Sequence, residues 1–230
     1  AGGRNHFFPN MIQPQSLYLA SGNSHKVREL QELADEAEMP MKFHSAATLG
    51  GMPEVVEDTG TFEGNARKKA LALKSLVPDG AWIVSDDSGI CVDALDGAPG
   101  VESAYFAGPQ ADDDLNLAKL VTEMTDVPLA KRSAYYVCVL HLQCSDEDEH
   151  AFRGECHGVL AHQPQGSGGF GYDPLFIPNG SNETFGVLPA DTKRLLSHRA
   201  LAWANLVTWW RVNRVEPNGE INRKYNHGYQ

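Results

Sequence analysis

The sequence lacks three features that would each point to a particular class of protein. No apolar run approaches the ~20 residues of a membrane-spanning helix, and no basic-then-apolar segment resembles a signal peptide. The four cysteines include no Cys-x-x-Cys pair, so we expect reduced thiols. Positive charge is scarce, with 19 Lys and Arg against 30 Asp and Glu. These absences predict a cytoplasmic protein with no membrane partner and no basic face for nucleic acid.

The chain has instead the composition of a globular protein, with 42% hydrophobic residues among 230. We expect one two-lobed domain over residues 16–212. Residues 1–15 contain no periodic pattern and are interpreted as a tag remnant or loose extension, and residues 213–230 as a polar tail. Four cations on the segment after Thr61 and a glycine-rich stretch near residue 170 stand out from this background.

The most unusual stretch begins at residues 81–84, an apolar run that predicts a buried strand. We expect this strand to end at residues 85–89, where Asp86 and Asp87 are neighbours, and to resume at Ile90. Because side chains alternate along a strand, one Asp would face a cleft while the other anchors the turn. A carboxylate at a strand end beside a Gly turn suits Mg²⁺ and leaves ligand positions for phosphate. An ordinary Asp-rich turn is the alternative.

A second candidate site is the polar loop between a short strand, residues 17–20, and a helical pattern that starts near Val27. Its backbone N–H groups and the helix dipole would attract phosphate, and Lys26 would add a full charge. The alternative is a helix capped by Asn23 or Ser24. The loop consists of Ser21, Gly22, Asn23, Ser24, His25 and Lys26.

Cations gather on the helix predicted to begin near Thr61, just after the carboxylate of Glu57. Lys69 borders the apolar stripe of this helix and is the candidate to turn inward. The other three cations are interpreted as a solvated face: Arg67, Lys68 and Lys74. The buried stripe is predicted to contain Phe62, Ala66, Ala70, Leu73 and Val77.

The third unusual stretch sets two aromatic residues among glycines at residues 166–174. Phe170 and Tyr172 could stack on a flat ring there, which favours a base-binding wall over a flexible linker. A mobile loop is the alternative. Further on, residues 193–199 are predicted to open a helix whose inner face holds Leu195, Ala202, Leu206 and Trp209.

Two strands, residues 134–142 and 151–161, flank an acidic turn and predict a hairpin. The histidines on or beside it show no fixed ligand spacing and are interpreted as structural or exposed: His141, His150, His157 and His162. Asp112, Asp113 and Asp114 begin a predicted helix and are interpreted as structural, since acidic residues there complement the helix dipole.

Seven motifs, spread in order between Leu17 and Leu206, resemble those of the Ham1-like inosine/xanthosine triphosphate pyrophosphatases. They are Ser21-Gly22-Asn23-x-x-Lys26, Glu57-Asp58-Thr59-Gly60, Asn65-Ala66-x-x-Lys69-Ala70, Ser85-Asp86-Asp87-Ser88-Gly89, Gly97-Ala98-Pro99-Gly100, Gly168-Gly169-Phe170-Gly171-Tyr172-Asp173-Pro174 and Ser197-His198-Arg199. Seven ordered motifs are far more specific than any one of them.

The resemblance implies an α/β fold with a long central mixed sheet flanked by helices, and two lobes around a deep nucleotide-binding cleft. It implies a Mg²⁺-dependent homodimer that converts ITP, dITP and XTP to the monophosphate and pyrophosphate. Glu57 and Asp87 would then bind Mg²⁺, and Asp87 would accept the proton. The nucleotide would contact residues Ser21 to Lys26 together with Lys69, Ser88, Phe170, Gly171, Tyr172, Asp173, Lys193, His198 and Arg199.

Elementary chemistry supports these implied roles. Lys26 and Lys69 with Mg²⁺ would neutralise the triphosphate while Asp87 takes a proton from water. Arg199 and His198, as donors, would hydrogen-bond to the carbonyl of hypoxanthine or xanthine and would disfavour the amino group of adenine.

Three positions depart from the family's pattern. Glu63-Gly64 places a carboxylate one position early, and Tyr105 and Val187 stand where a cation and an acidic residue are common. These departures bear on substrate preference and dimer contacts, because they leave the candidate catalytic and base-reading residues in place.

Three other interpretations stay open. A related Maf-like pyrophosphatase would act on pyrimidine or modified nucleotides, and the motifs around Phe170 and His198 speak against it. A non-catalytic nucleotide-binding or sensing module would keep the cleft without turnover, although Glu57 and Asp87 are both present. A purely structural protein would not need aromatic residues among glycines beside a cationic helix start.

Overall fold

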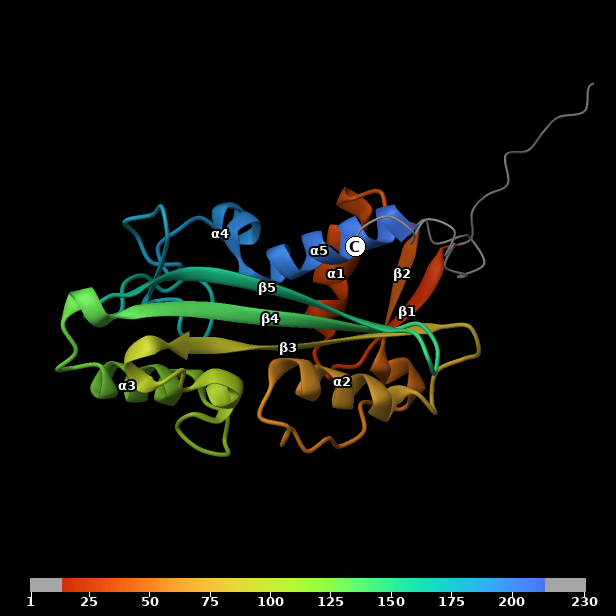
Figure 1. Ribbon diagram of the computed structural model, residues 1–230, viewed down its shortest axis with the longest axis horizontal. Helices are drawn as coiled ribbons and strands as arrows, with labels where there is room; N and C mark the ends of the chain where they lie inside the picture. Colours follow the sequence, from red (N-terminus) through yellow and green to blue (C-terminus); the bar gives the residue numbers. More distant parts are fainter. Residues whose placement is uncertain (1–13, 214–230) are drawn as a thin grey trace, which may run out of the picture.

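The structure, a computed structural model, describes residues 14–213, with the side chains of Ser24 and His25 outside the described part. It contains a six-stranded mixed sheet in the order β2-β1-β3-β4-β5-β6, which confirms the predicted α/β fold (Figure 1). The strands are β1 (Gln15–Leu19), β2 (Met41–Ser45), β3 (Trp82–Val92), β4 (Ser133–Gln143), β5 (Glu149–Leu160) and β6 (Phe176–Pro178). The α-helices are α1 (Ser24–Glu36), α2 (Phe62–Leu73), α3 (Asp113–Glu123), α4 (Ala190–Leu196) and α5 (His198–Asn213). Short 3₁₀ helices cover Ala46–Leu49, Asp93–Leu95, Gly100–Tyr105 and Leu129–Lys131.

Strand β3 is the centre of the sheet and changes its pairing along its length. It runs parallel to β1 only as far as the pair Leu19 and Val84, and antiparallel to β4 over nearly all of its residues. Within residues 14–213, no strand pairs with its β1-facing edge from Ser85 until Cys91 meets Pro99. The predicted hairpin is present as β4 and β5, which pair in continuous antiparallel register.

Helices cover both faces of the sheet. Figure 1 shows α4 and α5 on one side of the long strands and α2 and α3 on the other. Leu30 of α1 and Leu206 of α5 share one core cluster with Leu140 of β4. Helix α2 begins after Thr61, whose side chain accepts a hydrogen bond from the Gly64 backbone N–H at 3.1 Å. Its buried face contains the predicted Phe62, Ala66, Ala70 and Leu73, with Val77 packed partly buried nearby.

Strand β3 does not break where the sequence predicted. It runs without interruption through residues 85–89, so Asp86 and Asp87 lie inside a strand and not at its end. The buried Ser85, Asp86 and Asp87 are tolerated there because each has a specific partner. The buried Ser85 hydroxyl, for example, donates to the Ala66 carbonyl of α2 at 2.5 Å.

The helix predicted from residue 193 onward is two helices. Ser197 has an extended backbone (φ −67, ψ 151) and ends α4, and its hydroxyl accepts from the Ala200 backbone N–H to cap α5. The break turns Leu195 outward, where it is 75% exposed, so its predicted inner position is wrong. Ala202 and Leu206 are buried as predicted, and Trp209 packs partly buried against the core.

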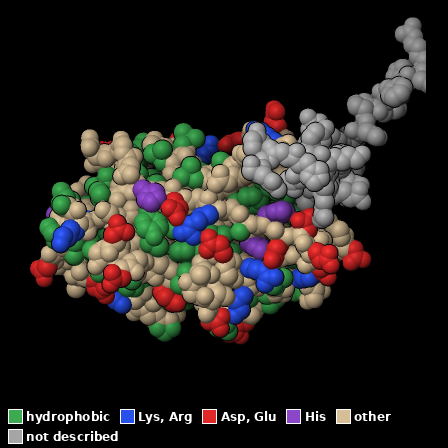
Figure 2. All heavy atoms as spheres, viewed as in Figure 1, with side chains coloured by type: hydrophobic (Ala, Val, Ile, Leu, Met, Phe, Trp, Pro, Cys, Tyr) green, Lys and Arg blue, Asp and Glu red, His purple; other side chains and the backbone are tan. Residues whose placement is uncertain are grey.

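Among residues 14–213, no helix combines the length and the apolar character that crossing a bilayer requires. Figure 2 shows Lys and Arg side chains interspersed with Asp and Glu on one face, without a continuous basic surface in that view. The predicted extension and polar tail fall almost entirely in residues 1–13 and 214–230, outside the described residues. The domain limits at residues 16 and 212 therefore stay a prediction.

Candidate active site

Asp86 and Asp87 face opposite sides of the sheet, as strand alternation predicted. Asp86 faces α1 and α5, whereas Asp87 faces α2 and the loop that precedes it. Both carboxylates are nearly inaccessible to solvent, with exposures of 4% and 7%. A buried carboxylate is costly unless it is paired, so the partners of each Asp determine its chemistry.

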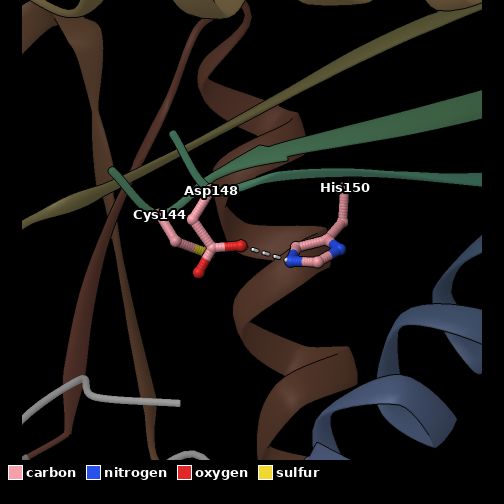
Figure 3. Close-up of side chains that lie close together, drawn as sticks. All are labelled: Cys144, Asp148 and His150. Carbon is pink, nitrogen blue, oxygen red and sulfur yellow. Dashed lines mark hydrogen bonds and ion pairs between the residues drawn. The ribbon is translucent and has the colours of Figure 1, made fainter. Parts of the chain in front are cut away.

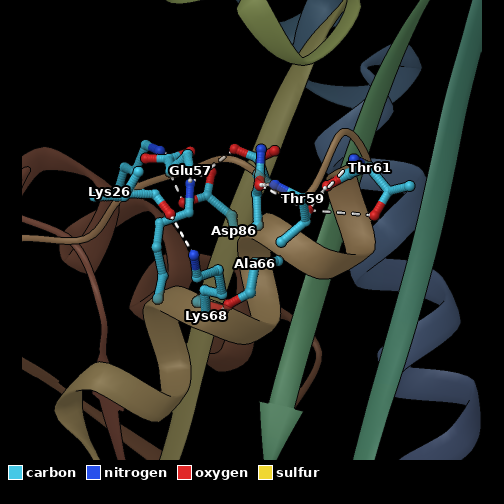
Figure 4. Close-up of polar contacts among 12 residues, drawn as sticks. Lys26, Glu57, Thr59, Thr61, Ala66, Lys68 and Asp86 are labelled. Atoms are coloured by element: carbon cyan, nitrogen blue, oxygen red, sulfur yellow. Dashed lines mark hydrogen bonds and ion pairs between the residues drawn. The ribbon is translucent and has the colours of Figure 1, made fainter.

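Asp86 holds two cations from different parts of the chain. The Lys26 ammonium donates to both of its oxygens, at 2.8 and 2.7 Å (Figure 4). The Arg199 guanidinium lies 3.3 Å from Oδ2. Burial opposes ionisation, but these two charges outweigh it and hold the pKa of Asp86 well below its usual range. Asp86 is therefore a permanent anion that anchors Lys26 and Arg199. The predicted turn-anchoring role is wrong, because there is no turn.

Asp87 has the opposite environment. Its Oδ1 accepts from the Lys69 ammonium at 2.8 Å, and Lys69 also donates to Glu57 at 3.1 Å. Its Oδ2 is buried and has no hydrogen-bond partner among the described residues. Burial, reinforced by the nearby Glu57 charge, outweighs the attraction of Lys69 and raises the pKa of Asp87 to about 6. A carboxylate with this pKa is ionised at neutral pH and accepts a proton readily.

Lys69 turns inward as predicted, while the other cations of α2 point to the surface. Burial opposes its charge, but the carboxylates of Asp87 and Glu57 raise the pKa of Lys69, which stays protonated. The other two α2 cations, and Lys74 just after the helix, form ion pairs on the surface. These pairs are Arg67 with Glu149, Lys68 with Asp58, and Lys74 with Asp146.

The polar loop after β1 and the acidic loop before α2 enclose one cavity of about 230 Å³. Its lining includes Ser21, Gly22, Lys26, Glu57, Lys69 and Asp86. The cavity thus receives cations and carboxylates from both faces of the sheet. The backbone N–H of Asn23 donates to the Ser21 hydroxyl at 3.1 Å. The predicted contacts of the Ser24 and His25 side chains lie outside the described residues.

Two further cavities, of about 160 and 370 Å³, share the side chains of Phe170 and His198. The smaller cavity also contains Ser88, Gly171 and Tyr172, and the larger contains Lys193 and Arg199. Arg199 of the larger cavity pairs with Asp86, which lines the cavity that contains Lys26. The structure therefore brings together residues from every sequence motif that was assigned to nucleotide binding.

His198 is a neutral side chain in this region. Burial, with help from the Arg199 and Lys193 charges, lowers the pKa of His198 to about 3. Its ring stacks on Tyr136 with centroids 4.8 Å apart, and its Nδ1 is buried without a hydrogen-bond partner in the part of the chain that the structure describes. Buried polar atoms normally have a partner, so this nitrogen is a candidate contact for a ligand.

The glycine-rich loop presents one aromatic ring and buries the other. Phe170 is 58% exposed beside the cavities, with the Lys193 ammonium 4.4 Å from its ring centroid. Tyr172 is 5% exposed and its hydroxyl donates to the Ser103 carbonyl at 2.7 Å, so it cannot stack on a ring as freely as expected. Asp173 ties the loop together, accepting from the Phe170 backbone N–H at 2.8 Å and pairing with Lys193.

The departure at residues 63 and 64 has a steric explanation. Glu63 points away from the cavity and pairs with Arg153 at 2.9 Å. A Cβ at Gly64 would lie 2.3 Å from the Thr59 hydroxyl oxygen, closer than any real contact. Thr59 in turn donates to Asn65 at 2.8 Å. A glutamate at position 64 would push Thr59 out of its place. The glycine at position 64 therefore accompanies the shift of the carboxylate to position 63.

Sequence reasoning missed two residues that shape the site. Asp86 was recognised but given no site role, although the period of the strand already placed it opposite Asp87. Tyr136, which stacks on His198 and donates to Asp173 at 3.2 Å, lay in an apolar strand and carried no signal of its own.

The arrangement matches a known family. A sequence model described as the Ham1 family matches residues 17–209. The chain belongs to the Ham1 family. A relative in Opitutus terrae, named dITP/XTP pyrophosphatase, is 52% identical over 85% of this chain and 98% of its own length. A relative of the same name in Geobacter sulfurreducens is 42% identical over 83% of this chain and 94% of its own.

Solved structures of the Ham1 family share the fold. The HAM1 protein from Coxiella burnetii is 33% identical, with a TM-score of 0.78 over 86% of this chain and 98% of that one. A nucleoside-triphosphatase / dITP/XTP pyrophosphatase from Mycobacterium abscessus is 35% identical, with a TM-score of 0.71 over 84% and 98%. The resemblance drawn from the sequence motifs is confirmed.

Proposed function

We propose that this Ham1-family protein hydrolyses the non-standard purine nucleotides ITP, dITP and XTP to their monophosphates and pyrophosphate. This activity would keep these bases out of DNA and RNA. The observation that carries the proposal is the buried Asp87, whose pKa is raised to about 6 beside Lys69 and Glu57. The names of the curated relatives support the same reaction.

Asp87 is the general base of the proposed reaction. Above pH 6 it is ionised, and its Oδ2 has no protein donor that would compete for a proton. It would take the proton from the water that attacks the bond between the α and β phosphates. Lys69 fixes its other oxygen and lowers the cost of the buried charge.

The charge of the triphosphate would be offset by Lys26 and Lys69, which reach one cavity from opposite faces of the sheet. Mg²⁺ would be held beside this cavity by Glu57, which lines it, and by Asp87, which Lys69 links to it. Carboxylate oxygens are the hard ligands that Mg²⁺ prefers, and the Asp87 Oδ2 has no hydrogen-bond partner among the described residues. When bound, Mg²⁺ would neutralise phosphate oxygens and so favour attack at phosphorus. Lys26 is held in position by Asp86.

The base would lie between Phe170 and His198, where an exposed ring borders a buried imidazole. Phe170 offers a stacking face. A neutral His198 carries one N–H, and Arg199 carries only donors, so both favour a purine with a carbonyl at the position of the adenine amino group. A mismatch would leave buried donors unpaired, which is the source of strong discrimination.

Pyrophosphate release tests the proposal directly. The substrates are ITP, XTP, dITP, ATP, GTP and TTP, each with Mg²⁺ and with a chelator. The proposal expects metal-dependent release from the first three alone. Faster release from TTP would favour the Maf-like alternative. Tight ITP binding without release in saturating Mg²⁺ would favour a binding module.

Two further features belong to the same proposal. We infer a homodimer from the family resemblance, and sedimentation velocity would contradict it by giving the mass of a single 25.1 kDa chain. We also infer that the enzyme acts in the cytoplasm, where a nucleotide pool is found. Fractionation of cells that express the protein would test this.

A further inference from the structure

The tip of the β4–β5 hairpin gathers three different metal-binding side chains. Gln143 and Glu149 are the last paired residues, and beyond them the Cys144 backbone N–H donates to the Asp148 carbonyl at 2.8 Å. Cys144 and Asp148 are therefore opposite each other across the hairpin. Asp148 lies just before β5 and His150 is the second residue of that strand, and their side chains are in hydrogen-bond contact. Figure 3 shows the three side chains converging.

The distances suit a small cation. The Cys144 sulfur, one Asp148 oxygen and one His150 ring nitrogen all lie within 4.8 Å of one another. The Asp148 and His150 atoms are already 2.8 Å apart. Zn²⁺ bonds of about 2.0 Å to nitrogen or oxygen and about 2.3 Å to sulfur place tetrahedral ligands about 3.3 to 3.6 Å apart. Small side-chain rotations would bring these atoms to that spacing.

We propose that Cys144, Asp148 and His150 form a second metal site, specific for Zn²⁺ or a similar borderline dication and separate from the nucleotide site. Thiolate and imidazole select such ions over Mg²⁺, which prefers oxygen ligands. The fourth position would be filled by water. The nearest catalytic candidate, Asp87, pairs with Val139 of β4, well before the hairpin tip.

The surroundings hold the ligands in place. The His150 ring packs against Trp209 of α5, with centroids 4.3 Å apart, and Asp148 fixes its ring nitrogen. A supporting ring contact of this kind orients a ligand before the metal arrives. The cluster also links the hairpin to α5, so a bound cation would tie these two elements together. A cleft beside the hairpin reaches Cys144 and provides a route for the ion.

Binding would exchange a proton for the metal. Burial, and then the Asp148 charge, raise the pKa of the Cys144 thiol, so the metal-free thiol keeps its proton. On binding, the S–H bond breaks, the sulfur–metal bond forms and the thiol proton leaves to solvent. The proton that the His150 Nε2 donates to Asp148 moves to Nδ1, so that the Nε2 lone pair can bind the metal. No oxidant or reductant is involved. The spacing of these residues along the chain gave no sign of the site, because the ligands meet across the hairpin.

Cobalt titration of the full-length protein tests the site. After treatment with a chelator, Co²⁺ is added while thiolate-to-cobalt charge-transfer absorption is recorded. We expect one equivalent of Co²⁺ per chain, displaced by Zn²⁺ but not by Mg²⁺. C144S should abolish the band, and H150Q and D148N should each weaken binding by at least about 10-fold. Circular dichroism would confirm that each variant is folded.

His157→Gln is the matched control. His157 forms the same histidine–carboxylate contact with Glu155 two residues earlier on β5, at 2.9 Å, but belongs to no such metal-binding cluster among the described residues. It should leave the cobalt band unchanged. The proposal is wrong if no band forms, if C144S retains it, or if H157Q weakens it as much as H150Q does. Zn²⁺ should also raise the Tm of the wild type but not of C144S.

Discussion

Asp86 and Asp87 are adjacent residues of the same type on the same strand, yet their environments are opposites. Asp86 meets Lys26 and Arg199 and has a lowered pKa, whereas Asp87 meets Lys69 and the competing charge of Glu57 and has a raised one. Burial is similar for both. The difference shows that the charged partners of a buried carboxylate, and not its burial alone, determine whether it anchors cations or accepts a proton.

The largest expected effect is on turnover. Asp87→Asn keeps the shape of the side chain but removes the group that accepts the proton, so pyrophosphate release from ITP should fall by about 10³-fold or more. Binding of ITP, measured by calorimetry, should persist because the cavities around Phe170 are untouched. If turnover survives, Asp87 has no part in the chemistry and the comparison with Asp86 loses its functional meaning.

The next effect concerns stability. Asp86→Asn leaves Lys26 and Arg199 without their shared anion and should lower the free energy of unfolding by about 3 kcal/mol. Urea denaturation measures it. Asp146→Asn is the control, since Asp146 is 81% exposed in its pair with Lys74 and its loss should cost less than about 0.5 kcal/mol. Equal losses in the two variants would mean that Asp86 anchors nothing.

Asp87→Asn should change stability in the opposite direction. Because the folded pKa of about 6 exceeds the ordinary value of 3.8, the native state binds more protons between these pH values, and stability falls as pH rises through them. At pH 7.5 in chelator, the variant should therefore be about 1–2 kcal/mol more stable than the wild type. The gain should vanish below pH 4. A variant that is less stable at pH 7.5 would contradict the raised pKa.

The smallest effect lies away from both carboxylates. Phe170 is more than half exposed, so Phe170→Ala should leave the Tm unchanged. Loss of a stacking face worth about 1 kcal/mol or more should raise the KM for ITP about 5- to 10-fold, with little change in kcat. A fall in kcat with an unchanged KM would indicate that the purine base does not stack on Phe170. Leu195→Ala, also exposed but absent from the cavity lining, is the control.

The fold followed from the sequence where period and composition agreed. The inward turn of Lys69 and the buried stripe of α2 were predicted from helical spacing, and the structure confirms both. The continuity of β3 was not predictable from propensity. Asp, Ser and Gly favour turns, but pairing with β4, the hydrogen bond from Ser85 to Ala66 and the ion pairs of the two Asp residues keep them extended.

The candidate site could be predicted from the sequence less completely than the fold. The motifs identified Lys26, Asp87 and His198, but the ion pairs between distant segments decide what each does. Arg199 was expected to read the base, and the structure shows in addition that it pairs with Asp86 and lies 3.6 Å from Glu29. Such long-range ion pairs leave no periodic pattern in the sequence, so a sequence-based interpretation could not have predicted them.

The early end of β1 determines how a ligand reaches the sheet. β1 stops at Leu19, opposite Val84, while β3 continues to Val92, and the cavity that contains Lys26 and Lys69 lies beside this uncovered edge. One extended molecule lying across the edge would touch groups from both sides of a rigid layer at once. The length of β1, which sets how much of the β3 edge is uncovered, would then limit the size of the molecule that fits.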